Sequence, residues 1–215
     1  MSHETLPIFP LGLVLLPGLP LPLHIFEERY RDMVARCLDE NVEFGVLLYD
    51  GAKLRSHGCL ARIERILKTY DDGRLDIVTV GTDRFRVQEM DNSGPYMQAQ
   101  VERFTDEDSD DVSIGDLRND AIQRLQAFVD LGERSIDMQT LESLDATALS
   151  FLIAGTDAFE AHEKQRLLEI TSTGERLRRC VEALEGTLER LELNRRIKKI
   201  IGTNGHIPDA FGPEP

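Results

Sequence analysis

The N-terminal part of the chain carries an apolar run that prolines interrupt at short intervals. Because a proline lacks an N–H and clashes with the preceding turn, residues 6–26 cannot form one helix. A membrane-spanning helix needs about 20 continuous apolar residues, and a secretion signal begins with basic residues, whereas this chain begins Met-Ser-His-Glu. We therefore expect buried strand and loop over 6–26, followed by an amphipathic helix over 27–40. The interrupting prolines are Pro7, Pro10, Pro17, Pro20 and Pro22.

Short strand-like runs separated by turn signals follow. Asp71-Asp72-Gly73 predicts a hairpin, because Asp-Gly tolerates the positive φ of such turns. Gly81-Thr82-Asp83 predicts a second turn. Many short strands at close spacing predict a small, partly closed antiparallel β-barrel. The runs cover residues 44–49, 58–67, 75–80, 84–89 and 97–101.

The pattern changes after an acidic segment, Thr-Asp-Glu-Asp-Ser-Asp-Asp at 105–111. Like charges resist compaction, so this segment is a natural boundary. Beyond it, apolar positions recur at helical spacing, Asp145 precedes one predicted helix as a cap, and residues 160–170 form another. Ser172-Thr-Gly-Glu175 predicts a capping box before the last and longest helix. The apolar stripe of that helix contains Leu177, Val181, Leu184, Leu188 and Leu191.

Together these patterns predict an α+β fold: an N-terminal antiparallel β-barrel with a short helix, then an α-helical bundle that ends in a long helix. We expect the β-domain over residues 1–104, an acidic linker over 105–112, the bundle over 113–202 and a loose tail over 203–215.

Composition and charge limit the kinds of binding partner and the cellular compartment that we expect. The chain has 215 residues and a formal net charge of −14. An acidic protein repels phosphate backbones, so nucleic acid is an unfavourable partner. The cysteines, Cys37, Cys59 and Cys180, are odd in number and form no C-x-x-C motif, which indicates buried thiols in a reducing compartment. We expect a cytoplasmic protein without a targeting segment or membrane association.

Several of these stretches resemble, in order, the N-terminal domain of ATP-dependent Lon proteases. The likeness begins with LPIFPL and LPLHIFEERYRDMV and continues with FGV at 44–46 and GCLARIE at 58–64. It proceeds through VGTDRFRV at 80–87 to LLEITSTGERL at 167–177. The same domain occurs in cereblon-like proteins and in short stand-alone bacterial proteins. The resemblance implies that the β-domain is PUA-like.

Residues that match the family signature are given a structural role by this resemblance. We expect His24, which lies between apolar residues, to be hydrogen-bonded inside the barrel. Arg84 and Arg86 flank Phe85 on a predicted strand, and we expect them on a solvated edge, with contact to a partner as the alternative. The signature residues are Pro10, Pro17, His24, Phe26, Glu27, Arg29, Tyr30, Gly81 and Arg84.

No motif in the sequence specifies an enzyme. The phosphate loop GxxxxGK[ST] of an ATPase is absent, and the Ser–Lys dyad of Lon proteases belongs to a further domain. Ala161-His162-Glu163 begins like a zinc-protease motif, but Arg166 stands at the position of the second histidine. We therefore expect a non-catalytic protein that uses no cofactor and no metal.

In full-length Lon this domain is thought to recognise unfolded or degron-bearing proteins, so the resemblance implies a protein-binding module. Such binding requires an exposed apolar groove or a sheet edge. The proline-rich loop and the cleft between barrel and bundle are the candidate places. The candidate polypeptide-binding residues are Leu13, Leu15, Leu16, Leu19, Leu21 and Phe85. For most of the leucines between 13 and 23 the competing interpretation is burial in the core, because apolar runs are usually buried.

Two other functions stay open at this point. The chain could be an adaptor or regulatory partner of a complete Lon protease, since Arg195, Arg196, Lys198 and Lys199 form a basic cluster after an acidic body. It could also bind RNA, because PUA-like barrels include RNA-binding domains, although the acidic balance counts against this.

Overall fold

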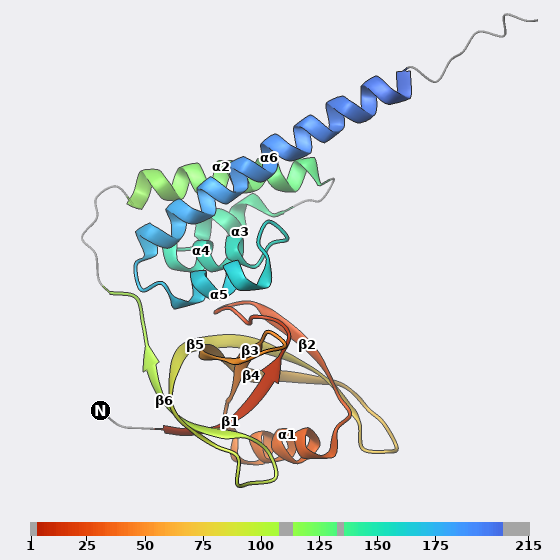
Figure 1. The fold of residues 1–215 in the computed structure, drawn as a ribbon, viewed down its shortest axis with the longest axis vertical. Coiled ribbons are helices and arrows are strands. Elements are labelled where there is room, and N and C mark those ends of the chain that lie inside the picture. Colours follow the sequence, from red (N-terminus) through yellow and green to blue (C-terminus); the bar gives the residue numbers. More distant parts are fainter. Residues whose placement is uncertain (1–3, 108–113, 133–135, 204–215) are drawn as a thin grey trace, which may run out of the picture.

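The computed structural model describes residues 4–107, 114–132 and 136–203, with side chains up to Ile197. Residues 108–112 of the predicted linker and 204–215 of the predicted tail lie outside these ranges. The strands form an N-terminal β-domain, and the helices after residue 113 lie together on one side of it (Figure 1). The strands are β1 (Glu4–Leu11), β2 (Pro20–Ile25), β3 (Phe44–Tyr49), β4 (Leu54–Thr69), β5 (Leu75–Asp91) and β6 (Gln98–Phe104). The helices are α1 (Glu28–Glu40), α2 (Ile114–Leu131), α3 (Met138–Ser143), α4 (Ala146–Ala154), α5 (Ala161–Glu169) and α6 (Thr173–Thr203).

The sheet of the β-domain closes on itself. Its order is β2-β5-β4-β3-β1-β6, and β6 also pairs with the second half of β5. The strand β2 pairs with the first half of β5. The strands β1 and β3 are parallel, because β2 and α1 cross between them, whereas the other pairings between described strands are antiparallel. The predicted α+β fold is confirmed, and the parallel pair is a detail that the strand pattern did not predict.

Small residues on facing strands make room for one large ring inside the closed part of the sheet. Phe85 is fully buried there. A Cβ added at Gly45 would stand 2.6 Å from its ring, and one added at Gly58 would stand 2.7 Å from it. The remaining space is filled by apolar side chains from β1, β3, β4 and β6. Phe85 is therefore part of the barrel core.

The strand β5 is continuous, so the predicted turn at Gly81-Thr82-Asp83 is wrong. At Gly81 the strand changes partner, from β2 to β6, and the loop between β1 and β2 docks onto it. The Gly18 N–H donates to the Gly81 carbonyl at 2.8 Å, and the Gly81 N–H donates to the Leu19 carbonyl at 3.0 Å. A Cβ at Gly81 would collide with the Leu16 carbonyl, so the glycine permits this close approach.

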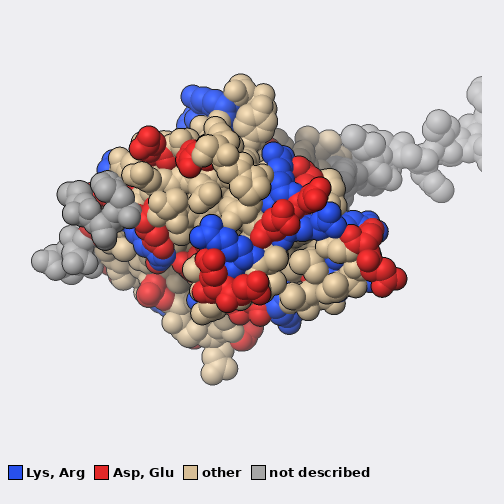
Figure 2. Space-filling model, turned by 90° about the horizontal axis from the view of Figure 1, so that it is seen from below, with Lys and Arg blue, Asp and Glu red and all other residues tan. Residues whose placement is uncertain are grey.

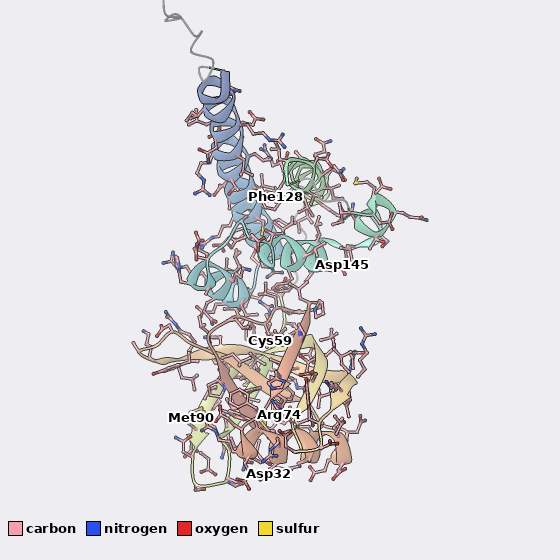
Figure 3. All side chains as sticks on the ribbon, turned by 90° about the vertical axis from the view of Figure 1, so that its right-hand side faces the viewer. Asp32, Cys59, Arg74, Met90, Phe128 and Asp145 are labelled. Atoms are coloured by element: carbon pink, nitrogen blue, oxygen red, sulfur yellow. The ribbon has the colours of Figure 1, made fainter. Side chains whose placement is uncertain are left out.

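The β1–β2 loop fills the seam between the β-domain and the helices (Figure 1). Leu15 and Leu16 are buried, and the Leu19 side chain packs where a Cβ of Gly155, at the end of α4, would stand. Cys59 of β4 lies at the same boundary (Figure 3). The proline-rich loop is thus a packing element between the two parts of the chain.

The helical part is built around α6. Leu177, Val181 and Leu184 are buried and Leu188 and Leu191 are half-buried, so the predicted stripe forms the inner face of the helix. The helix α2 lies beside α6, with Phe128 between them (Figures 1 and 3). The predicted cap is confirmed, since the Asp145 carboxylate accepts from the Ala148 N–H at 2.7 Å. No helix in the described part of the chain is long and apolar enough to cross a membrane.

Two buried arginines and one carboxylate join the β-domain to the helices; we call this cluster the Arg84–Asp106–Arg176 latch. Asp106 accepts hydrogen bonds from both guanidinium groups and from the Thr173 hydroxyl. Arg84, on β5, also donates to the Ile170 carbonyl at 2.6 Å, and Arg176, on α6, donates to Ser150 Oγ at 2.7 Å. Arg84 is 4% exposed, so the predicted solvated edge is wrong for it.

Candidate functional site

A pocket of about 500 Å³ opens on the β-domain where β1 and β2 end and α1 begins. Its walls come from separate segments of the chain, which only the fold brings together. The strand β1 contributes Phe9, Pro10 and Leu11, the segment from β2 into α1 contributes Leu23 to Glu27, Arg29 and Tyr30, and Tyr49, Leu54 and Met97 complete the wall.

Buried aromatic rings form the floor of this pocket. Tyr30 lies in the first turn of α1 on its apolar face, and its ring centroid is 4.2 Å from that of Phe9. Both residues are at most 7% exposed. Burial raises the pKa of the Tyr30 phenol, so the group is neutral at physiological pH. The floor therefore offers an uncharged, largely apolar contact surface.

Exposed aromatic residues stand at the mouth. Phe26, at the corner between β2 and α1, is 62% exposed, and Tyr49, at the end of β3, is 48% exposed. Large apolar side chains that stay exposed beside a pocket are typical of binding sites. The Phe26 ring stacks on the His24 ring with centroids 6.0 Å apart.

A hydrogen-bonded chain holds His24 in place beside Phe26. Its Nδ1 lies 2.6 Å from Asp76 Oδ1, and the Tyr70 hydroxyl donates to Asp76 Oδ2 at 2.8 Å. Hydrogen bonds from His24 and Tyr70 lower the pKa of Asp76, so this carboxylate remains charged. The His24 side chain is 43% exposed, and the prediction that it lies inside the barrel is wrong. Successive side chains of a strand point to opposite faces of the sheet, so Ile25 is buried and His24 is exposed.

Charges at the rim of the pocket are paired within the chain. Arg29 Nη2 lies 2.7 Å from Glu27 Oε2, and the Arg29 guanidinium also lies over the Tyr30 ring at 4.5 Å. Because the Arg29 cation has the Glu27 anion beside it, the rim favours an uncharged occupant over a charged one.

The predicted polypeptide-binding residues lie away from this pocket. Leu15, Leu16 and Phe85 are at most 3% exposed, so the expectation that they contact a partner is wrong: each fills the core. Leu19 and Leu21 are half-buried against that core. Leu13 is 37% exposed but stands on the loop, outside the pocket wall.

Most of the predicted signature residues come together at the pocket instead. The signature residues that line it are Pro10, His24, Phe26, Glu27, Arg29 and Tyr30. Pro17 is half-buried in the loop, while Gly81 and Arg84 belong to the seam. Sequence reasoning treated these residues as structural. Phe26 is the residue that could have identified the site. It is an aromatic residue directly after a strand whose core-facing positions are already filled by other apolar side chains.

Other chemistry in the described residues is limited. A smaller hollow, of about 160 Å³, lies between the β-domain and α5 and is lined by polar groups that include His57, Arg86 and Glu169. Burial raises the pKa of the Cys37 thiol to about 11 and that of Cys180 to about 12, so both are protonated. No group of three or more His, Cys, Asp or Glu side chains in residues 4–107, 114–132 and 136–197 is placed to hold a metal ion.

Comparison with known proteins agrees with the fold and with the sequence motifs. Residues 5–186 match the family described as the ATP-dependent protease La (LON) substrate-binding domain. Lon protease 2 of Syntrophobacter fumaroxidans is 28% identical over 206 residues, and Lon protease 2 of Herpetosiphon aurantiacus is 26% identical over 205 residues. These alignments cover 91% and 90% of this chain but 26% and 25% of the relatives. The chain thus spans about a quarter of the length of the curated relatives it matches.

Solved structures give the same result. The crystal structure of a Lon N-terminal domain protein from Xanthomonas campestris is 30% identical, with a TM-score of 0.64 over 83% of this chain and 98% of that one. The N-terminal domain of the Mycobacterium avium complex Lon protease shares the fold, with a TM-score of 0.71 at 19% identity over 85% of this chain and 98% of that one. The resemblance inferred from the motifs is confirmed, and the chain belongs to the family of ATP-dependent protease La (LON) substrate-binding domains.

Proposed function

We propose that the chain is a non-catalytic polypeptide-binding module, which holds apolar side chains of unfolded or degron-bearing proteins in the pocket between β1 and β2. The observation that carries this proposal is the exposed aromatic mouth, with Phe26 at 62% exposure above a floor of buried rings. A folded protein hides its large apolar side chains, whereas an unfolded one displays them. The pocket can therefore distinguish the two states without reading a particular sequence.

Replacing Phe26 with Ala is expected to weaken binding of an unfolded protein by about tenfold, as aromatic residues at the centre of an interface commonly contribute this much. The ligand is reduced, carboxymethylated α-lactalbumin, which stays unfolded, and binding is measured by fluorescence anisotropy. Leu67→Ala is the matched control, since Leu67 is 56% exposed on β4 and does not line the pocket. The proposal fails if Phe26→Ala binds as tightly as the wild type, or if native α-lactalbumin binds as well as the unfolded form.

A second candidate function, adaptor or partner of a complete Lon protease, is favoured by the end of α6. Arg195 donates to the Leu131 carbonyl at the end of α2, and near this point Leu193 and Ile197 are 57% and 43% exposed. The side chains of Lys198 and Lys199, which belong to the predicted basic cluster, lie outside the described residues. Capture of one stoichiometric partner from lysate, independent of heat, would favour this function over general client binding.

RNA binding, the third hypothesis, receives less support. Acidic and basic side chains are interspersed on the face of the molecule seen from below (Figure 2). The formal net charge of −14 disfavours a phosphate backbone.

A further inference from the structure

Two strand edges border the pocket, and both could in principle pair with an incoming polypeptide. Strand addition requires main-chain N–H and C=O groups at alternating positions along a free edge. The hydrogen bonds already made by β1 and β2 decide which of their residues present those groups.

The open edge of β2 carries prolines. Among the described strands, β2 pairs only with β5. The Leu19 carbonyl accepts from the Gly81 N–H, and the Leu21 carbonyl accepts from the Thr79 hydroxyl. The main-chain groups of the odd-numbered residues of β2 therefore face β5. Because main-chain groups alternate along a strand, Pro20, Pro22 and His24 face the open edge. Of these three, His24 alone has an N–H to donate.

The end of β1 also presents a proline, which has no N–H to donate, at its open side. The pairing of β1 with β6 extends to Pro7 opposite Gln98, and the Ile8 N–H then donates to the Met97 carbonyl at 2.8 Å. The main chain of Ile8 thus faces away from β3. By the same alternation the next residue facing this side is Pro10, which lines the pocket and has no N–H.

We propose that a polypeptide bound at this pocket is held by its side chains and does not join the sheet as an added strand. Prolines on edge strands prevent pairing in native sheets. The paired charges of Glu27 and Arg29 select an uncharged side chain, and the aromatic floor selects a large apolar one. The substrate class is therefore any segment that can present such a side chain, whether extended, helical or irregular. This inference rests on the proposed function, because it describes the binding mode of the same site.

Peptides with blocked main-chain donors test this binding mode. The probe is the peptide acetyl-Gly-Ser-Phe-Gly-Ser-Leu-Gly-Ser-Phe-Gly-Ser-amide, compared with two versions that carry N-methyl groups on the odd or on the even backbone amides. An added strand presents only one of these two sets of N–H groups to the edge it joins. Side-chain binding predicts that both N-methylated peptides bind the full chain within threefold of the parent, as measured by isothermal titration calorimetry.

The outcomes separate this inference from the function on which it rests. A loss of more than threefold with either N-methylated peptide, or with both, overturns side-chain binding, while binding of the parent still supports the pocket. A parent peptide that does not bind, or whose binding is unchanged by Phe26→Ala, overturns the proposed function and this inference with it. Similar affinities for all three peptides, each reduced by Phe26→Ala, support both.

Discussion

Replacing Asp106 with Asn is expected to lower the free energy of unfolding by about 3–5 kcal/mol, because it leaves two buried guanidinium groups without a carboxylate. Arg176 is fully buried and Arg84 is 4% exposed, so neither charge can turn to solvent without opening the seam. Urea-induced unfolding followed by circular dichroism measures the change.

Glu102→Gln is the matched control, since it makes the same chemical change in a pair that solvent reaches. Arg86 Nη2 lies 2.8 Å from Glu102 Oε2, with 54% and 31% of the two side chains exposed. Exposed pairs of this kind contribute about 0–1 kcal/mol. Equal losses in Asp106→Asn and Glu102→Gln would show that the latch is not a main source of stability.

The contribution of Asp106 is also expected to depend on pH. Burial alone would raise the pKa of this carboxyl, but hydrogen bonds from Arg176 and Thr173 and the charges of Arg176 and Arg84 outweigh burial and lower it. A carboxyl with a lower pKa in the folded state stabilises that state above its unfolded pKa of about 3.9, and this is lost as the pH falls through the folded pKa. The difference between wild type and Asp106→Asn should thus be constant from pH 7 to pH 5 and shrink below about pH 4. A difference undiminished at pH 2.5 would contradict this account.

Phe85→Ala is expected to cost about 3–5 kcal/mol of stability, the usual range for removing a fully buried ring. The ring fills the space that Gly45 and Gly58 leave open, and those backbones cannot collapse into the cavity because they are held in the ladders of β3 and β4. Thermal unfolding and urea titration both report this loss.

Phe26→Ala provides the comparison, because Phe26 is the same residue type at 62% exposure. Its stability should stay within about 0.5 kcal/mol of the wild type, as for other surface substitutions. Phe85→Ala therefore destabilises the fold, and Phe26→Ala impairs binding. A large loss of stability in Phe26→Ala would instead make the mouth of the pocket a structural element.

Local sequence patterns predicted most helices and strands. The predictions failed where contacts between residues far apart in the sequence determine the structure. The helix at 27–40 and the cap at Asp145 depend on neighbouring residues, and both were predictable. Gly81 was misread as a turn because its role depends on Leu16, which approaches from a separate loop. The helix α3 has six residues, too few for a helical period to be recognised.

Several residues that line the candidate site could be recognised in the sequence, but the position of the site in the fold could not. The motif LPLHIFEERY contains several of its lining residues in one stretch of sequence. Tyr49, Leu54 and Met97 join them only through strand pairing, which a single sequence does not specify. Arg84 illustrates the same limit: alternation places it on the same face of β5 as Arg86, but Arg84 is buried because it shares Asp106 with Arg176, which comes from the last helix.

The position of the β1–β2 loop has a consequence for the order of folding. Leu19 packs against Gly155, near the end of α4, although the two residues lie far apart in the sequence. Contacts between residues so distant in sequence form slowly, because a long loop must close before they add any stability. The hairpins of the β-domain and the turns of the helices involve shorter loops. We therefore expect the seam to form late in folding, and until it closes, Leu15, Leu16 and Leu19 are open to non-native contacts.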